Sequence, residues 1–339
     1  MTTTTVRRGA LAIEAAAFSD TGPRPENQDV VRWWETPDGW AVAVADGMGG
    51  QRSGRLAAEV AVDALAQAGP LRSLDDLRRA VRAADAAVRQ RAQEGHEGMG
   101  CALGLLVFAA PPGDVPRWLG AHVGDVRILS RAPDGTLRLE TRDHTPAFAR
   151  WEAGELAFDA IPDAPGANRL QRAVGHGGEP DVFWLPARPG WRFALLSDGV
   201  TKALRWDELA VALAGPPTAA LDALRRKLTE RGTDDNATAV VLEVHPAAPE
   251  PTPNPEDTVP HPPPWAPAPR RGAALPLMAA LLALLVALAA AALAWQSGRR
   301  EAALRREIEA LRLRVDSLRD RLSRVEEPFG PSPGTPPAP

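Results

Sequence analysis

The stretch Val44-Ala45-Asp46-Gly47-Met48-Gly49-Gly50 ends an apolar run on an Asp-Gly pair, and Leu195-Leu196-Ser197-Asp198-Gly199 repeats the design. A third aspartate, Asp235, opens another apolar run. Short apolar runs are typical of buried strands, so each strand is expected to deliver an acid to its end, where the chain turns. Gathered acids repel one another, and burial adds to the cost. A hard divalent cation with oxygen ligands relieves both penalties, so the pattern predicts a metal site.

Length, charge and cysteine content limit the classes of protein to which the chain can belong. Its 339 residues suffice for one large domain or two ordinary ones. The net charge of −4 gives no reason to invoke nucleic acid, and a nuclease is disfavoured because no basic groove is expected in the first domain. A single cysteine, Cys101, excludes an internal disulfide and disfavours a cysteine-rich zinc site. As a phosphatase nucleophile Cys101 would need an arginine where Val107 stands, so we expect it to be structural.

Strand-like and helix-like runs alternate from about Ala10 to His245. Apolar runs bounded by turn residues predict buried strands over 40–45, 116–123, 191–196 and 237–244. Capping residues and apolar periodicity predict helices after Ser53, after Ser73, over 206–214 and over 218–231. Glycine, proline and poor periodicity predict a mobile flap or irregular subdomain over 145–173.

The composition changes after residue 245. Proline dominates 246–271, which predicts an extended, semi-rigid linker. No charged residue occurs among the 23 residues from Ala273 to Trp295, a length that can cross a bilayer. We therefore predict a single transmembrane helix over 272–296. A buried core helix and an alanine-rich soluble helix are the alternatives.

An apolar heptad seam follows the predicted span. Its members alternate spacings of four and three: Leu304, Ile308, Leu311, Val315, Leu318, Leu322 and Val325. This spacing predicts a short coiled-coil helix over 297–327 and a parallel homodimer through 304–325. A single amphipathic helix lying on the membrane or on a partner is the alternative. Residues 328–339 are expected to form a disordered, proline-rich tail.

Short motifs occur in a fixed order across the first 245 residues. They are Ser19–Arg24 leading to Asn27–Asp29, Ala45–Gly50, His122–Arg127, Arg142–Thr145, Leu196–Val200 and Asp235–Thr238. Together they resemble the metal-dependent serine/threonine protein phosphatases of type 2C, the PPM family, and its bacterial branch in particular. The resemblance implies an α+β fold, a four-layer αββα sandwich of two antiparallel sheets flanked by helices, for residues 1–245. The linker, span and heptads lie outside it.

The resemblance also implies the metal ligands. Asp46 would bridge two Mn²⁺ or Mg²⁺ ions, and the Gly47 carbonyl, Asp198 and Asp235 would complete the protein ligands. Asp125 matches an aspartate that holds a third, weaker metal in bacterial relatives.

Two further residues complete the implied catalytic set. Asp29 would orient metal-bound waters, and Arg24 would bind the substrate phosphate with its planar fork of donors. The implied reaction is hydrolysis of phosphoserine and phosphothreonine on cytoplasmic proteins by attack of a dimetal-bound water. The partners would be phosphorylated proteins, including a serine/threonine kinase.

Some positions depart from the family pattern. Gln28 stands where the family often has glutamate, Ala102 replaces a threonine, and Val126 replaces a serine. These losses support an alternative function, a catalytically weak phosphoprotein-binding module on a membrane-anchored dimer. Retention of the three aspartates favours the enzyme. His144, in a loop of the family, is expected to be structural.

Two rules conflict over the orientation of the predicted span. Six arginines follow it between residues 299 and 314, whereas Arg270 and Arg271 precede it, so the positive-inside rule favours a cytoplasmic C-terminus. Met1 to Ala10 shows no signal peptide, which favours a cytoplasmic first domain. We expect a single-pass protein of the inner or plasma membrane, with the phosphatase domain in the cytoplasm and the heptad helix outside.

Overall fold

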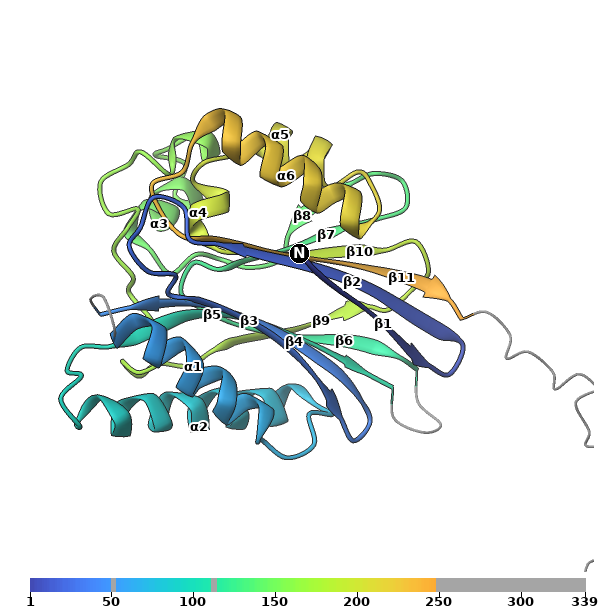
Figure 1. The fold of residues 1–339 in the computed structure, drawn as a ribbon, viewed down its shortest axis with the longest axis horizontal. Coiled ribbons are helices and arrows are strands. Elements are labelled where there is room, and N and C mark those ends of the chain that lie inside the picture. The colour runs from blue at the N-terminus through green and yellow to red at the C-terminus, as the bar shows by residue number, and fades with distance from the viewer. Residues whose placement is uncertain (50–52, 111–114, 248–339) are drawn as a thin grey trace, which may run out of the picture. The chain divides into compact units, whose positions relative to one another are not determined.

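Two antiparallel sheets form the centre of the computed structural model, which describes residues 1–49, 53–110 and 115–247 (Figure 1). The six-stranded sheet has the order β1 (Thr2–Arg8), β2 (Leu11–Asp20), β11 (Ala237–Pro246), β10 (Arg192–Leu196), β7 (Arg127–Arg131) and β8 (Leu137–Leu139). The five-stranded sheet has the order β3 (Asp29–Thr36), β4 (Gly39–Met48), β5 (Gly100–Ala109), β6 (Arg117–Val123) and β9 (Asp181–Pro186). The four apolar runs predicted as strands correspond to β4, β6, β10 and β11.

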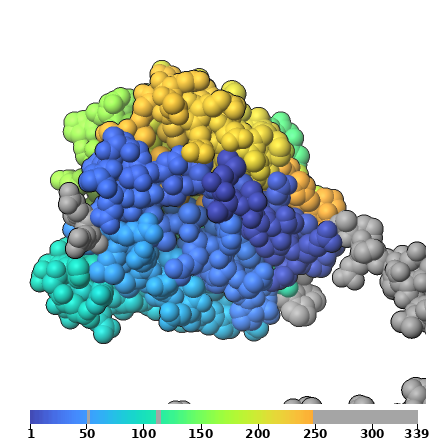
Figure 2. All heavy atoms as spheres, viewed as in Figure 1, coloured from blue at the N-terminus to red at the C-terminus, as the bar shows by residue number. Residues whose placement is uncertain are grey.

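Helices cover the outer face of each sheet (Figure 1). The five-stranded sheet carries α1 (Ser53–Ala66) and α2 (Leu74–Ala92), and the six-stranded sheet carries α4 (Asp198–Thr201), α5 (Trp206–Ala212) and α6 (Pro217–Arg231). The four-layer αββα sandwich is therefore confirmed. Figure 2 shows blue N-terminal residues packed beside yellow and orange C-terminal ones, because β2 pairs with β11 and lies under α6.

Three apolar layers separate the four layers of secondary structure. In β4 the odd-numbered residues from Ala41 to Ala45 pack under α1 and α2, and the even-numbered residues from Trp40 to Val44 face the other sheet. The third layer joins β2, β10 and β11 to α4, α5 and α6. A strand alternates its side chains between two faces, so a strand buried on both faces is apolar throughout. This explains the continuous apolar runs in the sequence.

The segment 145–173 is irregular, as its glycines and prolines predicted. It contains α3 (Pro146–Glu152) and a 3₁₀ turn (Phe158–Ala160). Trp151 contacts Phe148 and Phe158 edge-on, with ring centroids 4.9 and 5.1 Å apart, in a small apolar cluster of the segment's own. This cluster orders the segment without regular strands.

All described residues belong to one compact unit, Met1–Thr252. The predicted linker beyond residue 247, the transmembrane helix, the coiled coil and the tail lie outside the described residues. Among the helices that the structure does describe, none is both long enough and apolar enough to cross a membrane.

The core between the sheets gives a first prediction. Trp118 on β6 is fully buried, with ring centroids 5.3 Å from Phe108 and 5.4 Å from Phe193 of the opposite sheet. Trp118→Ala should lower the free energy of unfolding by about 3–5 kcal/mol, because it leaves a large cavity. Trp184→Ala on the neighbouring strand β9 is the control, since Trp184 is 66% exposed. Equal losses for the two variants in urea unfolding would contradict this assignment of the core.

Candidate active site

The pleat of β4 carries Asp46 to the face between the sheets. Asp46 continues the even-numbered series from Trp40 to Val44, and its register partner on β3 is Asp29. Directly opposed residues on paired strands share a face, and like charges in that arrangement repel. The five-stranded sheet thus places two carboxylates side by side at one end of the inter-sheet core.

The six-stranded sheet brings two more aspartates to the same end. Asp198 is the first residue of α4, directly after β10, and Asp235 precedes β11, the neighbour of β10. Between them, the Ser197 hydroxyl donates to Asp29 Oδ2 at 2.9 Å and accepts from the Thr238 backbone N–H at 2.9 Å. Ser197 therefore fastens one sheet to the other beneath the acids.

The glycines of the two Asp-Gly pairs allow close backbone approach. A side chain on Gly47 would begin 2.1 Å from the Gly54 carbonyl oxygen, and one on Gly199 would begin 2.0 Å from the Asn236 carbonyl oxygen. Neither glycine has a positive φ, and β4 continues through Gly47 to Met48. The expectation that the chain turns at these pairs holds for Asp198, which follows the end of β10 and begins a helix. It fails for Asp46 by two residues, because β4 continues to Met48.

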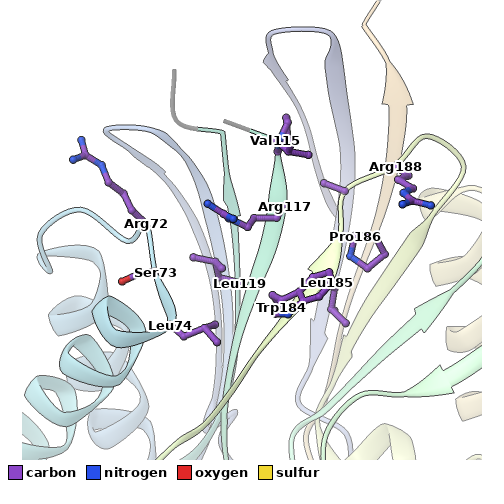
Figure 3. Close-up of a pocket in the computed structure, with 12 residues that line it drawn as sticks. Arg72, Ser73, Leu74, Val115, Arg117, Leu119, Trp184, Leu185, Pro186 and Arg188 are labelled. Carbon is purple, nitrogen blue, oxygen red and sulfur yellow. The ribbon is translucent and has the colours of Figure 1, made fainter. Parts of the chain in front are cut away.

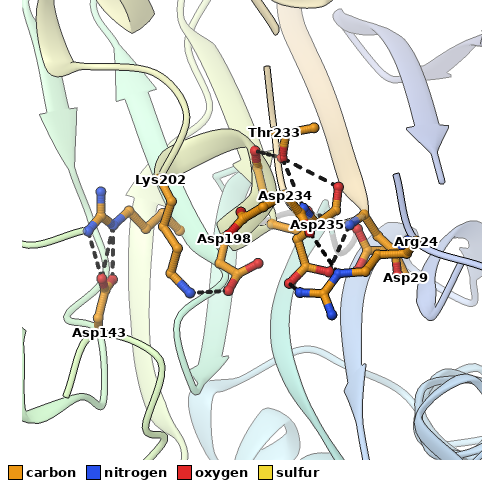
Figure 4. Close-up of polar contacts among 12 residues, drawn as sticks. Arg24, Asp29, Asp143, Asp198, Lys202, Thr233, Asp234 and Asp235 are labelled. Carbon is orange, nitrogen blue, oxygen red and sulfur yellow. Dashed lines mark hydrogen bonds and ion pairs between the residues drawn. The ribbon is translucent and has the colours of Figure 1, made fainter. Parts of the chain in front are cut away.

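A cavity of about 1050 Å³ gathers the residues predicted from the sequence. Arg24, the four aspartates 46, 125, 198 and 235, and Gly47 all border it. Asp29 lies beside it and is 2% exposed. Figure 4 shows Arg24, Asp198 and Asp235 converging from different segments, with Lys202 pointing toward Asp198. The structure thus brings every predicted site residue to one end of the sandwich.

The clustered acids resist ionisation. Burial raises the pKa of Asp29 to about 7, and the charges of Asp198 and Asp235 add to that effect against hydrogen bonds that lower it. Burial, followed by the charges of neighbouring aspartates, also raises the pKa of Asp46 and of Asp125 well above the usual range. The pKa of Asp235 is raised by burial and by Asp198, although Arg24 opposes the shift. In the absence of a cation, each of these shifts favours the protonated carboxyl group.

Two carboxylate oxygens in the cluster have no hydrogen-bond donor. Asp29 Oδ1 and Asp198 Oδ1 are buried and lack a partner among the described residues. Buried polar atoms are normally satisfied, and an all-oxygen donor set suits Mg²⁺ or Mn²⁺. The residues present therefore fit hard divalent cations.

Arg24 is engaged by the chain itself. Its Nε donates to the Asp234 carbonyl at 2.7 Å and its Nη2 to Asp235 Oδ2 at 2.9 Å. The loop that carries Arg24 is held by Asn236, whose amide donates to the carbonyls of Thr21 and Glu26 at 2.8 and 3.0 Å. Half of the Arg24 side chain remains exposed at the mouth of the cavity.

Sequence reasoning assigned no role to Lys202, Ser197 or Asn236. Lys202 Nζ pairs with Asp198 Oδ2 four residues earlier. Burial lowers the pKa of Lys202, but attraction to Asp198 and Asp125 outweighs it, and the net shift is upward. The i, i+4 spacing from Asp198 was the available signal, because residues at that spacing are neighbours on a helix.

The substituted positions differ in where they lie. Val126 is fully buried in the layer between the sheets and packs over Gly104. Gln28 and Ala102 border the cavity. The hydroxyl lost at Val126 is therefore lost from the apolar core, whereas the one lost at Ala102 is lost from the cavity wall.

His122, His144 and Asp181 form a second group whose ligand atoms lie within 4.8 Å of one another. The Gly124 backbone N–H donates to His144 Nδ1 at 3.0 Å, which fixes the proton of the neutral ring on Nε2. That Nε2 faces Asp181 Oδ2 at 3.1 Å, so it donates and is not free to bind a metal. Burial lowers the pKa of His122 to about 3. We assign this group to structure, as expected for His144.

Cys101 lies on β5 and is fully buried. Burial raises the pKa of its thiol, with the charge of Asp46 adding to the shift. A thiol held in its protonated form is a poor nucleophile, which agrees with the structural role expected for it.

A smaller cavity, of about 490 Å³, lies away from the acids. It is bordered by exposed Trp184 and by Leu185 and Leu119, with Arg72 and Arg188 at its edges (Figure 3). Among the described residues that line it there is no carboxylate, histidine or cysteine. The residues predicted for metal binding border the larger cavity instead.

Comparisons with known proteins agree with this geometry. The family model described as protein phosphatase 2C matches residues 25–233. The serine/threonine protein phosphatase PstP of Mycobacterium tuberculosis is 33% identical over 254 residues, covering 70% of this chain and 46% of PstP, so the chain spans about half of that relative. The serine/threonine phosphatase stp of Listeria monocytogenes is 29% identical, covering 65% of this chain and 91% of that protein.

A solved structure extends the comparison to three dimensions. The PstP catalytic domain in complex with two manganese ions has a TM-score of 0.60 and 31% identity to this chain. The match covers 69% of this chain and 99% of that domain.

The raised pKa of Asp29 gives a prediction for the metal-free protein. Its folded-state pKa of about 7 exceeds the unfolded value, so its contribution to stability is lost as the pH rises from about 4 through 7. Asp29→Asn cannot ionise. In the presence of a chelator, its free energy of unfolding relative to that of wild type should therefore rise by about 2–4 kcal/mol between pH 4 and 8. Urea unfolding at both pH values measures this change, with Asp222→Asn, at an exposed position on α6, as control. A gain independent of pH would show that Asp29 does not titrate in this window.

Proposed function

The chain belongs to the protein phosphatase 2C family, and from this we propose that it hydrolyses phosphoserine and phosphothreonine on proteins with two bound Mn²⁺ or Mg²⁺ ions. One observation carries the proposal. Asp46 from one sheet and Asp198 and Asp235 from the other converge on one cavity whose acids lack enough cations of their own. The relative solved with two manganese ions supports the choice of metal.

Three of the acids that border the cavity would hold the metals. We assign the carboxylates of Asp46, Asp198 and Asp235 and the Gly47 carbonyl as ligands, and Asp29 as the group that orients water beside them. Two divalent ions in such a site supply an activated water and neutralise charge on the phosphoryl group. Asp29 suits its role because Ser197 fixes one of its oxygens at 2.9 Å and leaves the other without a donor.

Arg24 would bind the substrate phosphate. Its guanidinium lies at the mouth of the cavity, half exposed, beside the Asp235 carboxylate. A planar fork of N–H donors can contact two phosphate oxygens at once. The open cavity of about 1050 Å³ has room for a phosphorylated side chain presented by a protein. Arg24 would thus place the phosphorus atom above the aspartates.

Asp198→Asn tests the mechanism. It removes a ligand charge and almost no volume, so phosphatase activity should fall by orders of magnitude while the fold is kept. The measurement is turnover of an aryl phosphate and of a phosphothreonine peptide, with and without Mn²⁺, and Asp222→Asn serves as control. Wild-type turnover that survives exhaustive chelation, or unchanged turnover in Asp198→Asn, would refute the proposal.

We further propose that residues 272–296 anchor the enzyme as a single-pass membrane protein and that 304–325 pair it with a second copy. The uncharged stretch from Ala273 to Trp295 and the heptad spacing after it support this proposal. Protein kinases use cytoplasmic ATP, so phosphoprotein substrates, with a serine/threonine kinase among them, favour a cytoplasmic phosphatase. The heptad helix would then lie on the other side of the membrane.

Variants with one introduced cysteine test this topology. Cys101 is too deeply buried to react, so the exposed Val211 is the internal position and Ser323 the external one. In intact cells a membrane-impermeant thiol reagent should label Ser323→Cys and not Val211→Cys, and after lysis it should label both. Labelling of neither in intact cells would place both sites inside and exclude a single crossing.

A further inference from the structure

Lys202 lies at the wall of the acid cavity, and the proposed reaction leaves it without a role. It follows α4, and its Nζ pairs with Asp198 Oδ2 one turn earlier (Figure 4). The side chain is 22% exposed. Lys202 is also one of two lysines among the chain's 39 lysines and arginines. A compact ammonium thus occupies a position in the metal site itself.

Asp125 lies near the same ammonium, whose positive charge attracts it as well as Asp198. The three residues border one void of about 10 Å³, which is room for about one water molecule. Arg127 also borders the void, but it is committed to Asp143, donating from Nη2 at 2.7 Å and from Nε at 3.1 Å. Of the described residues at this void, Lys202 is therefore the cation left for Asp125 and Asp198.

We propose that Lys202 is the resident cation of the Asp125–Asp198 pair, so that the chain binds two divalent ions and no third ion at Asp125. The inference rests on the proposed metal-dependent function. It departs from the role that family resemblance implied for Asp125. Lys202 acts here as a positioning residue that holds Asp198 and Asp125 together.

Competition for the same two carboxylates is the physical reason. A divalent ion at Asp125 would lie beside the positive ammonium of Lys202, and it would have to compete with that ammonium for Asp198. Displacing Lys202 would break its pair with Asp198 in a largely buried setting. Asp235, by contrast, pairs with Arg24, which is half exposed and so can give way to a metal ion at small cost.

Counting bound Mn²⁺ tests the proposal without reference to turnover. Free Mn²⁺ is measured by electron paramagnetic resonance while the purified full chain, in mild detergent, is titrated near neutral pH. Wild type should bind two ions per chain. Lys202→Met keeps the length of the side chain but not its charge, and it should bind three. Lys202→Arg keeps the charge and should bind two.

Lys227→Met is the matched control, because Lys227 pairs only distantly, at 3.8 Å, with Glu208 away from the aspartates. It should bind two ions. Lys202→Gln repeats the test if circular dichroism shows that Lys202→Met does not fold. Three ions in wild type, or two in a folded neutral variant, would overturn the inference and leave the proposed function intact. A wild type that binds no Mn²⁺ would overturn the proposed function and the inference with it.

Discussion

Repulsion among aspartates at the end of the inter-sheet core is the constraint on which the site depends. Asp29 and Asp46 are register partners on one sheet, and the other sheet adds Asp198 and Asp235 across the gap. Carboxylates this close and this buried stay protonated or require cations. The apolar layer between the sheets supplies the rigidity that holds them there, and Ser197 ties the two sheets together directly beneath them.

Small residues let neighbouring backbone segments approach closely enough for the aspartates to meet. Gly47 and Gly199 lie against backbone carbonyl oxygens, and a side chain on Gly124 would begin 2.4 Å from the Ala102 methyl group. Ala102 therefore does more than lack a hydroxyl, because it packs against the turn that carries Asp125. The departures from the family pattern thus affect packing as well as polarity at this end of the sandwich.

Much of this arrangement could be predicted from the sequence, because strand ends and glycine pairs are local features. The apolar runs located four strands, and the aspartates beside them marked the site. Contacts between distant segments could not be predicted in this way. Arg24 meets Asp235 across 211 positions, and Asn236 holds the loop of Arg24 across a similar span. The position of Val126, in the core and not in the cavity, likewise depends on how β7 stacks on the other sheet.

The cations near the cavity differ in how easily each can exchange its partner, and depth decides the difference. Arg127 is 6% exposed and bidentate to Asp143, so it serves the fold. Arg24 is half exposed, and a surface ion pair contributes little, so it can leave Asp235 for a phosphate at small cost. Lys202 lies between these extremes, and it cannot leave without breaking its ion pair with the largely buried Asp198. All three side chains carry the same charge. The difference in burial therefore explains why Arg24 can change its partner while Lys202 and Arg127 keep theirs.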